Sequence, residues 1–347
     1  MKKKVTIQDI ADAVGYSKTT VSRYINGQTN MMSAETANRI KNVIELLDYH
    51  PSELARSLKT KKTYTVGVIV SDIASPFSAS VVAGTGEVLE RNGYVPLFIN
   101  CHEDPAKEKI AISTLVSKGV DGLIVNTTSP DNDFLYGYQN QGVPIVLCDR
   151  KLRNYNMDIV EEDNEEIVSV LIHHLKEQGY TKIALLMQES LQSSAKNIRH
   201  SSFQKIMNEE FGPNADTSVF LTKDETVGSV SKCVKAFMET VREGEIPAII
   251  GANSVMTMLA FRAIKDMGYK MPDDVGLCGT NSWSWNESTI WMDMLRPTVS
   301  CVKIHGYEIG QKCAACILEK IENPSSPVKM IRVNTSFVPR ESTLRRK

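Results

Sequence analysis

One stretch decides the fold of the amino-terminal region: VTIQDIADAVGYSKTTVSRYING, residues 5–27. Thr6 and Asp9 have the spacing of a capping box, and apolar residues then recur with the period of a helix. Gly15 predicts the end of this helix, and Ser17 predicts the cap of a second one. The stretch therefore predicts two short helices joined by a tight turn.

A helix-turn-helix motif needs three features, and this stretch has them all. Ala11 is small enough for two helices to cross, Gly15 permits the tight turn, and Val21 can anchor the second helix through its apolar side. The outward side of that helix carries hydroxyls and cations but no acid, as a major groove lined by phosphates requires. We expect a DNA-reading helix here; the plain alternative is a three-helix bundle without a ligand.

A third helical pattern follows, and the chain then divides into three parts. We expect a DNA-binding domain at residues 1–50, a hinge helix and linker at 51–63, and a larger domain at 64–340. Residues 1–62 carry a net formal charge of +5, whereas the whole chain carries −1. A basic head joined to an acidic body is typical of a protein whose one end binds nucleic acid, although a solvated basic helix would give the same count.

Beyond residue 64, short β-branched runs alternate with longer amphipathic stretches. This rhythm predicts parallel strands with crossover helices, and hence a doubly wound α/β fold. The runs form two sets, so we expect two lobes with a changeover near residues 149–163. Ligands in such sheets bind beyond the carboxyl ends of the strands. The residues that follow the expected strands include Ser71 to Phe77, Asn126, Asp149, Asn253 and Asn281.

The composition indicates an ordinary globular chain, with 42% hydrophobic and 23% charged residues among 347. No apolar run is long enough to cross a membrane, and Met1 does not lead into an apolar signal segment, so we expect a cytoplasmic protein without a membrane partner. Seven cysteines lie mostly in apolar stretches, which predicts reduced core residues and excludes a secreted disulfide scaffold.

Patterns that could indicate an enzyme or a metal site lack their partners. Gly84-Thr85-Gly86 is not followed by the third glycine of a dinucleotide site. Cys313 and Cys316 have helix-core spacing, without the second cysteine pair or histidine cluster that zinc requires. We therefore expect no enzyme activity, no cofactor and no metal. The rival from another class is a sugar-binding or sugar-processing α/β protein whose head recruits it to nucleic acid.

Residues 5–27 resemble the DNA-binding head of the lactose/galactose repressor (LacI/GalR) family, and the resemblance covers nearly the whole chain. Further matches are Tyr49-His50-Pro51 and Ala55-Arg56-Ser57-Leu58 in the hinge, Val66-Gly67-Val68-Ile69, Gly119-Val120-Asp121-Gly122-Leu123-Ile124 and Gly179-Tyr180-Thr181-Lys182-Ile183-Ala184. The resemblance implies a dimeric repressor with a body like periplasmic sugar-binding proteins, whose affinity for operator DNA is switched by a small molecule. Only seven residues follow Arg340, too few for a tetramerising heptad helix, so we expect a C2 homodimer.

The resemblance also assigns DNA-binding residues. We expect Lys18, Thr19 and Arg23 to read base edges of double-stranded DNA. The residues expected to hold phosphates or to fix the helix are Thr6, Ser17, Thr20, Ser22 and Asn26. In the hinge, the resemblance implies that Leu58 wedges open a base step in the minor groove while Ala55 lets two hinge helices approach. Each monomer would cover one half-site of a near-palindromic operator.

The effector pocket is expected to bind an anion. Arg199 matches the arginine that clamps effectors in many family members. Ser254 and Ser282 stand where relatives often carry aspartates, and Lys223 stands where an aromatic residue is frequent. Relative to family members, this pocket has lost two acids and gained a cation. The guanidinium of Arg199 could therefore form two hydrogen bonds to a ligand carboxylate. Lys223 could instead be a solvated loop residue, and Arg199 could pair with a structural acid such as Asp163.

The start of the recognition helix, the turn from Asn26-Gly27 to Met32-Ser33-Ala34-Glu35-Thr36 and the hinge residues Ala55-Arg56-Ser57-Leu58-Lys59 look especially like family members that sense 2-keto-3-deoxygluconate. We therefore expect a hexonate or keto-sugar acid as effector. Its expected contacts are Arg199 and Lys223 for the acid group, Asn126, Asn253 and Asn281 for hydroxyls, and Phe77 with Trp283 as the lining of the crevice. The alternative within the family is a regulator that responds to a neutral sugar or a purine.

Overall fold

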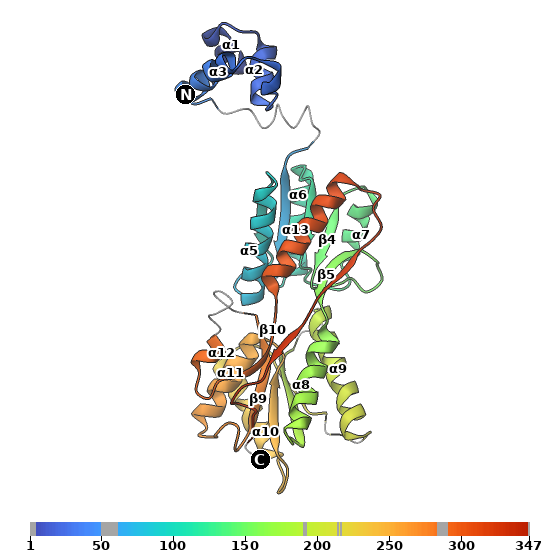
Figure 1. Ribbon diagram of the computed structural model, residues 1–347. Coiled ribbons are helices and arrows are strands. Elements are labelled where there is room, and N and C mark those ends of the chain that lie inside the picture. The colour runs from blue at the N-terminus through green and yellow to red at the C-terminus, as the bar shows by residue number, and fades with distance from the viewer. Residues whose placement is uncertain are drawn as a thin grey trace. The chain divides into compact units, whose positions relative to one another are not determined.

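The computed structural model describes residues 5–49, 62–189, 193–213, 215, 217–282 and 291–345 (Figure 1). The chain divides into two compact units, with the boundary along the sequence between Tyr64 and Thr65. Ala55, Leu58 and Trp283, for which the sequence predicts functional roles, lie outside the described residues.

The first unit is built on three helices, α1 (Ile7–Val14), α2 (Lys18–Ile25) and α3 (Ala34–Leu46), with a 3-10 turn η1 at Thr29–Met31. Its capping box is formed, because the hydroxyl of Thr6 accepts from the N–H of Asp9 at 3.3 Å and the carboxylate of Asp9 accepts from the N–H of Thr6 at 2.7 Å. Gly15 ends α1 with φ at 74°, a conformation that suits glycine. The buried core of the unit is Ile10, Ala11, Val14, Val21 and Ile40.

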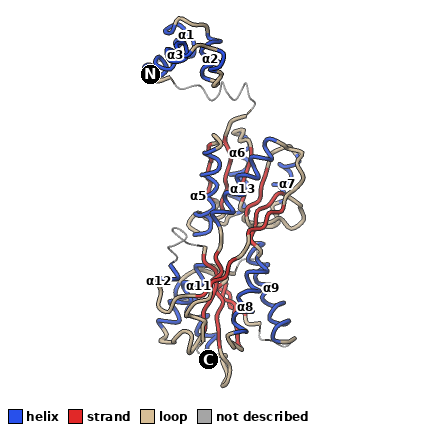
Figure 2. Tube along the Cα trace, viewed as in Figure 1, coloured by secondary structure: helices blue, strands red, loops and turns tan. Residues whose placement is uncertain are grey.

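The second unit has two lobes, each a six-stranded sheet with helices packed on it (Figures 1 and 2). The first lobe contains β1 (Thr65–Val70), α5 (Pro76–Arg91), β2 (Val95–Asn100), α6 (Pro105–Ser117), β3 (Gly122–Val125), α7 (Asp133–Asn140), β4 (Ile145–Cys148), β5 (Asp158–Glu162), α13 (Gly306–Glu322) and β11 (Met330–Val333). The second contains α8 (Asn164–Glu177), β6 (Lys182–Gln188), α9 (Ser194–Phe211), β7 (Val219–Thr222), α10 (Val227–Glu239), β8 (Pro247–Gly251), α11 (Ser254–Asp266), β9 (Gly276–Asn281), α12 (Trp291–Met294), β10 (Ser300–Lys303) and β12 (Ser336–Val338).

The strand orders are β11-β5-β4-β3-β1-β2 in the first lobe and β12-β10-β9-β8-β6-β7 in the second. Among the described strands, every pairing is parallel except that of β10 with β12. Central strands such as β1, β3 and β4 are buried along almost their whole length, because helices cover both faces of the sheet. The expected doubly wound α/β fold is confirmed.

Within the described ranges, the chain crosses between the lobes three times. It first crosses after β5, at the end of the range expected from the sequence. The two later crossings, from β10 to α13 and from β11 to β12, were not predicted. As a result, α13 packs beside α5 of the first lobe although more than 200 residues separate them (Figure 1).

Two glycines allow α5 and α13 to lie in direct backbone contact. A methyl group on Gly84 would overlap the carbonyl of Tyr307, and one on Gly310 would overlap the carbonyl of Val81. The buried hydroxyl of Thr85 donates to the carbonyl of Gly310 at 3.2 Å. Gly84 and Thr85 of the Gly84-Thr85-Gly86 pattern therefore serve the packing of two helices.

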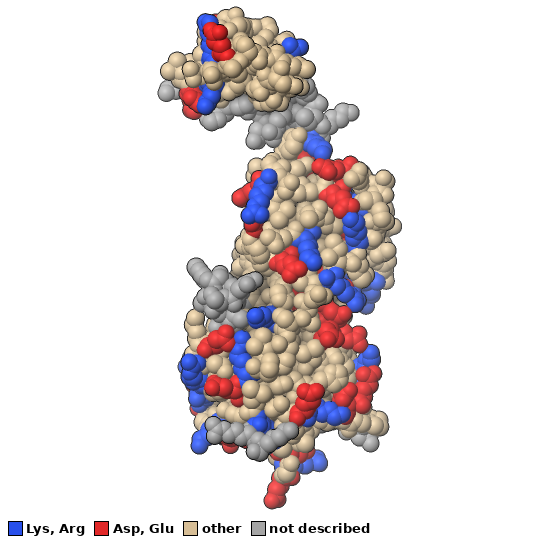
Figure 3. Space-filling view, in the orientation of Figure 1, with Lys and Arg blue, Asp and Glu red and all other residues tan. Residues whose placement is uncertain are grey.

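The surface of the second unit carries both signs of charge, with acidic and basic side chains interspersed on the face shown in Figure 3. None of the helices in the described ranges combines the length and apolar composition needed to cross a membrane. All seven cysteines are free thiols, and only Cys233 is not buried. The other six thiols pack in the interior, as the sequence predicts.

Candidate functional site

The outward side of α2 belongs to one concave surface of the first unit. This surface is lined by Ile7, Lys18, Thr19, Ser22, Arg23, Asn26 and Gln28. Lys18, Thr19 and Arg23 are exposed, and α2 contains no acidic residue. The structure thus brings together five of the residues expected to bind DNA, on a surface whose charge suits phosphates.

Two other expected DNA-binding residues, Thr6 and Ser17, cap helices. The hydroxyl of Ser17 accepts from the N–H of Thr20 at 3.2 Å and lies 2.9 Å from the hydroxyl of Thr20. Thr6 caps α1 in the same way, and the side-chain amide of Asn26 donates to the carbonyl of Ser22 at 2.6 Å, at the end of α2. These bonds fix the ends of the helices that carry the concave surface.

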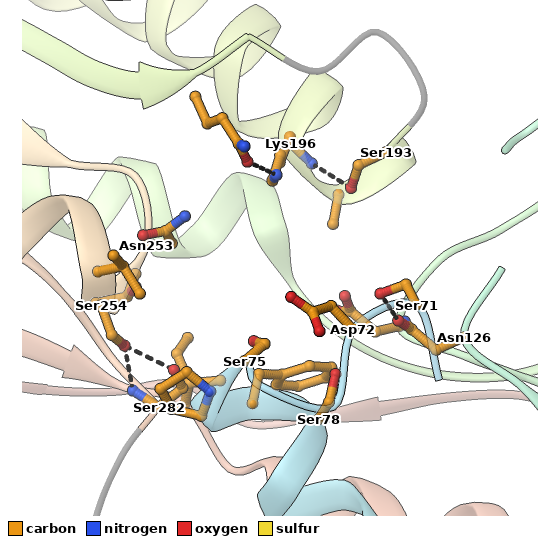
Figure 4. Close-up of a pocket in the computed structure, with 18 of the residues that line it drawn as sticks. Ser71, Asp72, Ser75, Ser78, Asn126, Ser193, Lys196, Asn253, Ser254 and Ser282 are labelled. Atoms are coloured by element: carbon orange, nitrogen blue, oxygen red, sulfur yellow. Dashed lines mark hydrogen bonds between the residues drawn. The ribbon is translucent and has the colours of Figure 1, made fainter. Parts of the chain in front are cut away.

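A cavity of about 270 Å³ lies between the two lobes of the second unit (Figure 4). Residues from both lobes line it, many of them just beyond the carboxyl ends of strands, where doubly wound sheets bind ligands. Its polar lining includes Ser71, Asp72, Glu103, Asn126, Asp149 and Arg150 of the first lobe, and Gln188, Lys196, Arg199, Glu225, Asn253, Ser254 and Ser282 of the second. Of the expected effector residues, Phe77, Asn126, Arg199 and Asn253 are present.

Arg199 reaches the cavity from α9. Its Nε donates to the side-chain oxygen of Asn164 at 2.7 Å, and its Nη1 donates to the carbonyl of Ala252 at 2.6 Å. Burial lowers the pKa of Arg199, whereas the carboxylates of Asp149 and Glu162 oppose that shift. The guanidinium stays charged at neutral pH, so it is a fixed cation in the wall of the cavity.

The amides expected to bind hydroxyls already have protein partners. The side chain of Asn126 accepts from Ser71 at 2.7 Å and donates to the carbonyl of Cys148 at 2.8 Å. That of Asn253 caps α11 and donates to the carboxylate of Glu225 at 3.0 Å. A ligand hydroxyl would join these hydrogen-bond networks, whose members already have fixed orientations.

Two of the residues expected to contact the effector, Lys223 and Asn281, do not line the cavity. Lys223 is exposed and is not among the residues that line the cavity, although Glu225, two residues later, is. Asn281 is buried, and its carbonyl accepts from the N–H of Ile304 at 2.8 Å. Because side chains alternate along a strand, Thr280 and Ser282 line the cavity and Asn281 points to the other side.

A second cation of the second lobe, Lys196, lines the cavity beside Arg199, and the sequence patterns did not predict it. Its Nζ donates to the side-chain oxygen of Gln188 at 2.7 Å. Burial lowers the pKa of Lys196, and so does the charge of Arg150, while Glu103 opposes the shift. Lys196 and Arg199 are three residues apart on α9, a helical spacing that could have identified the pair.

The cavity is not poor in acids, contrary to expectation. Four carboxylates line it, those of Asp72, Glu103, Asp149 and Glu225, together with the cations Arg150, Lys196 and Arg199. The hydroxyls of Ser254 and Ser282 lie 2.6 Å apart in the same lining (Figure 4). Asp72 and Asp149 follow expected strands, whereas the sequence patterns did not connect Glu103 and Glu225 with a site. The cavity therefore offers both cations and hydroxyl acceptors.

Glu103 and Arg150 form a two-pronged ion pair in the first lobe. Nη1 and Nη2 of Arg150 donate to the two carboxylate oxygens of Glu103 at 2.9 and 2.8 Å. Burial raises the pKa of Glu103, but the hydrogen bonds and charge of Arg150 outweigh it, and the pKa is lowered. Arg332, outside the cavity, takes Asp163 as its partner at 2.9 Å, so Asp163 does not neutralise Arg199.

Comparison with known families covers nearly the whole chain. Residues 6–52 match the family "Bacterial regulatory proteins, lacI family", and residues 63–340 match "Periplasmic binding proteins and sugar binding domain of LacI family". The chain is 30% identical to the HTH-type transcriptional regulator PtxS of Pseudomonas aeruginosa, over 98% of this chain and 96% of that protein. It is 29% identical to the HTH-type transcriptional regulator KdgR of Bacillus subtilis, over 99% and 100%, and 27% identical to the ribose operon repressor of Halalkalibacterium halodurans, over 97% of each.

Solved structures show the same fold. The lac repressor dimer bound to operator and the anti-inducer ONPF superposes with a TM-score of 0.83 at 23% identity, covering 99% of this chain and 100% of that chain. A helix-turn-helix unit and a two-lobed α/β unit therefore occur in both proteins. The chain belongs to the LacI family of DNA-binding transcriptional regulators, which bind operator DNA as dimers and respond to small-molecule effectors.

Proposed function

We propose that this regulator is a repressor of carbohydrate catabolism whose affinity for its operator is controlled by a small sugar acid. One observation carries the proposal: Arg150, Lys196 and Arg199 line a single cavity together with hydroxyl and amide groups. Guanidinium and ammonium groups bind a carboxylate, and the neutral groups suit sugar hydroxyls. The resemblance to family members that sense 2-keto-3-deoxygluconate supports the same class of ligand.

The proposal for DNA rests on the concave surface of α2. Lys18, Thr19 and Arg23 would read base edges, and their neighbours on this surface would hold phosphates. The minor-groove role of Ala55 and Leu58 stays a proposal from the sequence. Two copies of the chain would place two such surfaces on the halves of a near-palindromic operator.

The effector would act by changing the arrangement of the lobes. A ligand that touches both lobes binds one arrangement more tightly than another, and this difference in affinity sets how far DNA binding can shift. In this proposal the protein works in the cytoplasm, where operator DNA lies, and it has no catalytic step.

Calorimetry on the full chain tests the ligand class. 2-Keto-3-deoxygluconate should bind, whereas a neutral sugar of similar size should not. Arg199→Met should abolish binding, because it removes a cation from the cavity wall. Lys223→Met removes an exposed cation outside the cavity lining and should leave binding unchanged. Tight binding of the neutral sugar alone would contradict the proposal.

Operator variants test the DNA-reading face. Arg23→Ala should cost about 1–3 kcal/mol of binding free energy at one base pair if its guanidinium makes two hydrogen bonds to a guanine. Equal weakening across all variants would show that Arg23 contacts only phosphate. Arg39→Ala, which removes an exposed arginine outside the concave surface, is the matched control and should leave base preference intact.

A neutral sugar is the second candidate effector. The four carboxylates in the cavity are good acceptors for hydroxyl groups. One relative is a ribose operon repressor. The calorimetric comparison above distinguishes the two candidates directly.

A further inference from the structure

Within the cavity, the guanidinium of Arg150 already holds a carboxylate. The two hydrogen bonds from Arg150 to Glu103, at 2.9 and 2.8 Å, have the forked geometry that arginine adopts with any carboxylate. Nη1 of Arg150 also donates to the carbonyl of Thr127 at 3.2 Å. The guanidinium is therefore oriented by the protein backbone and aimed at a carboxylate position.

The two partners differ in how firmly they are held. The side chain of Arg150 is 10% exposed, whereas that of Glu103 is 44% exposed. Glu103 lies in a loop beyond β2 where His102 and Glu103 have φ values of 53° and 54°, in the left-handed region that residues other than glycine seldom adopt. The carboxylate is thus the member of the pair that can leave.

The second lobe presents a further cation to this position. Lys196 of α9 lines the same cavity, and its positive charge lowers the pKa of Glu103. The Glu103 carboxylate in turn opposes the lowering of the pKa of Lys196. Cations from both lobes therefore act on a single carboxylate, which makes this position sensitive to the arrangement of the lobes.

We propose that Arg150 and Lys196 form a carboxylate subsite, which Glu103 occupies in the ligand-free protein and which the carboxylate of a ligand takes over by displacing Glu103. This inference rests on the proposed sugar-acid function and assigns the groups that hold the acid. Glu103 then sets specificity, because a neutral ligand that displaced it would leave Arg150 buried without a charged acceptor.

Titration calorimetry on full-length variants tests the subsite, with 2-keto-3-deoxygluconate and gluconate as probes. Glu103→Gln should tighten binding of at least one sugar acid tenfold or more, because the ligand no longer competes with a carboxylate. Arg150→Lys keeps the positive charge but loses the two parallel hydrogen bonds of the guanidinium, and it should weaken binding tenfold or more. In the double variant Glu103→Gln/Arg150→Lys, the gain from Glu103→Gln should disappear.

Glu225→Gln is the matched control, because it removes the same charge from the same cavity at a carboxylate bonded to Asn253 instead of Arg150. It should not tighten binding of either sugar acid, because Arg150 keeps Glu103 as its partner. An equal gain in affinity in Glu225→Gln would overturn the subsite, because the net charge of the cavity would then account for the effect. Weaker binding in Glu103→Gln would also overturn it, since Glu103 would then hold the ligand itself.

The subsite and the proposed function fail in different ways. If the unaltered protein binds neither sugar acid but Glu103→Gln does, the subsite is supported and the proposed function is wrong. If neither protein binds a sugar acid, both are wrong. Thermal unfolding of each variant shows whether a loss of binding reflects a loss of fold.

Discussion

The DNA-reading surface and the effector cavity are assembled in opposite ways. The concave surface of the first unit is lined by residues between 7 and 28, whereas the cavity of the second unit is lined by residues between 71 and 304. A surface made from neighbours in the chain depends on helix caps and one small core. A cavity made from distant segments depends on how sheets and helices pack, so mutations should affect the two units differently.

The largest effect is expected for Ile40→Ala in α3. Ile40 is fully buried in the small core of the first unit, and its truncation should cost about 2–5 kcal/mol of folding free energy. Such a loss is a large share of the stability of a domain this small. Scanning calorimetry should show the transition of the first unit lowered or lost, with effector binding unchanged.

Lys41→Ala is the control, since it alters the exposed neighbour of Ile40 and should stay within about 0.5 kcal/mol of the unaltered protein. A matching fall in the transition of the second unit on Ile40→Ala would break the comparison, because the two units would then share their stability.

An intermediate effect is expected for Gly84→Ala in α5. The added methyl group would overlap the backbone of α13, so the first lobe should lose about 1–3 kcal/mol. Gly86→Ala in the same helix is the control. A Cβ there meets its nearest neighbour, the ring of Phe98, at 3.7 Å, so that variant should be neutral or slightly stabilised by helix propensity. Urea unfolding measures both, and equal stability of the two variants would show that the contact between α5 and α13 is not tight.

The smallest effect is expected for Ser17→Ala, which removes the cap of α2. The N–H of Thr20 loses its acceptor, at a cost of about 1 kcal/mol. Ser17→Gly introduces a residue that is tolerated at the N-cap, so it should cost only a few tenths of a kcal/mol. Helix content and thermal unfolding of the first unit give the readout. Indistinguishable alanine and glycine variants would mean that the cap does not stabilise α2.

Local features of the fold were predictable from the sequence. The capping box at Thr6 and Asp9, the turn at Gly15 and the cap at Ser17 all occur, because each depends on residues within four positions of one another. The alternation of strands and helices likewise predicts the doubly wound fold. The first crossing between lobes was placed within a few residues, since the strand pattern shows where one sheet ends.

The cavity was predictable only in part. Arg199 and the asparagines at strand ends line it, but Asn281 does not, because a shift of one residue along a strand reverses the direction of the side chain. Glu103 and Arg150 are 47 residues apart, and no spacing rule connects an acid beyond β2 with an arginine beyond β4. Such pairs depend on the order of strands in the sheet, which the sequence pattern does not contain.

The three crossings between the lobes have a consequence for synthesis on the ribosome. The first lobe lacks α13 and β11 until residue 333 has been added, although its other strands end at Glu162. At about 5–20 residues per second, that interval is roughly 10–35 s. During this time β5 is an unpaired edge, and the side of α5 that will meet α13 is uncovered. The nascent first lobe therefore has to be kept from aggregation while the second lobe is being made, and chaperones that shield apolar surface should bind it in that interval.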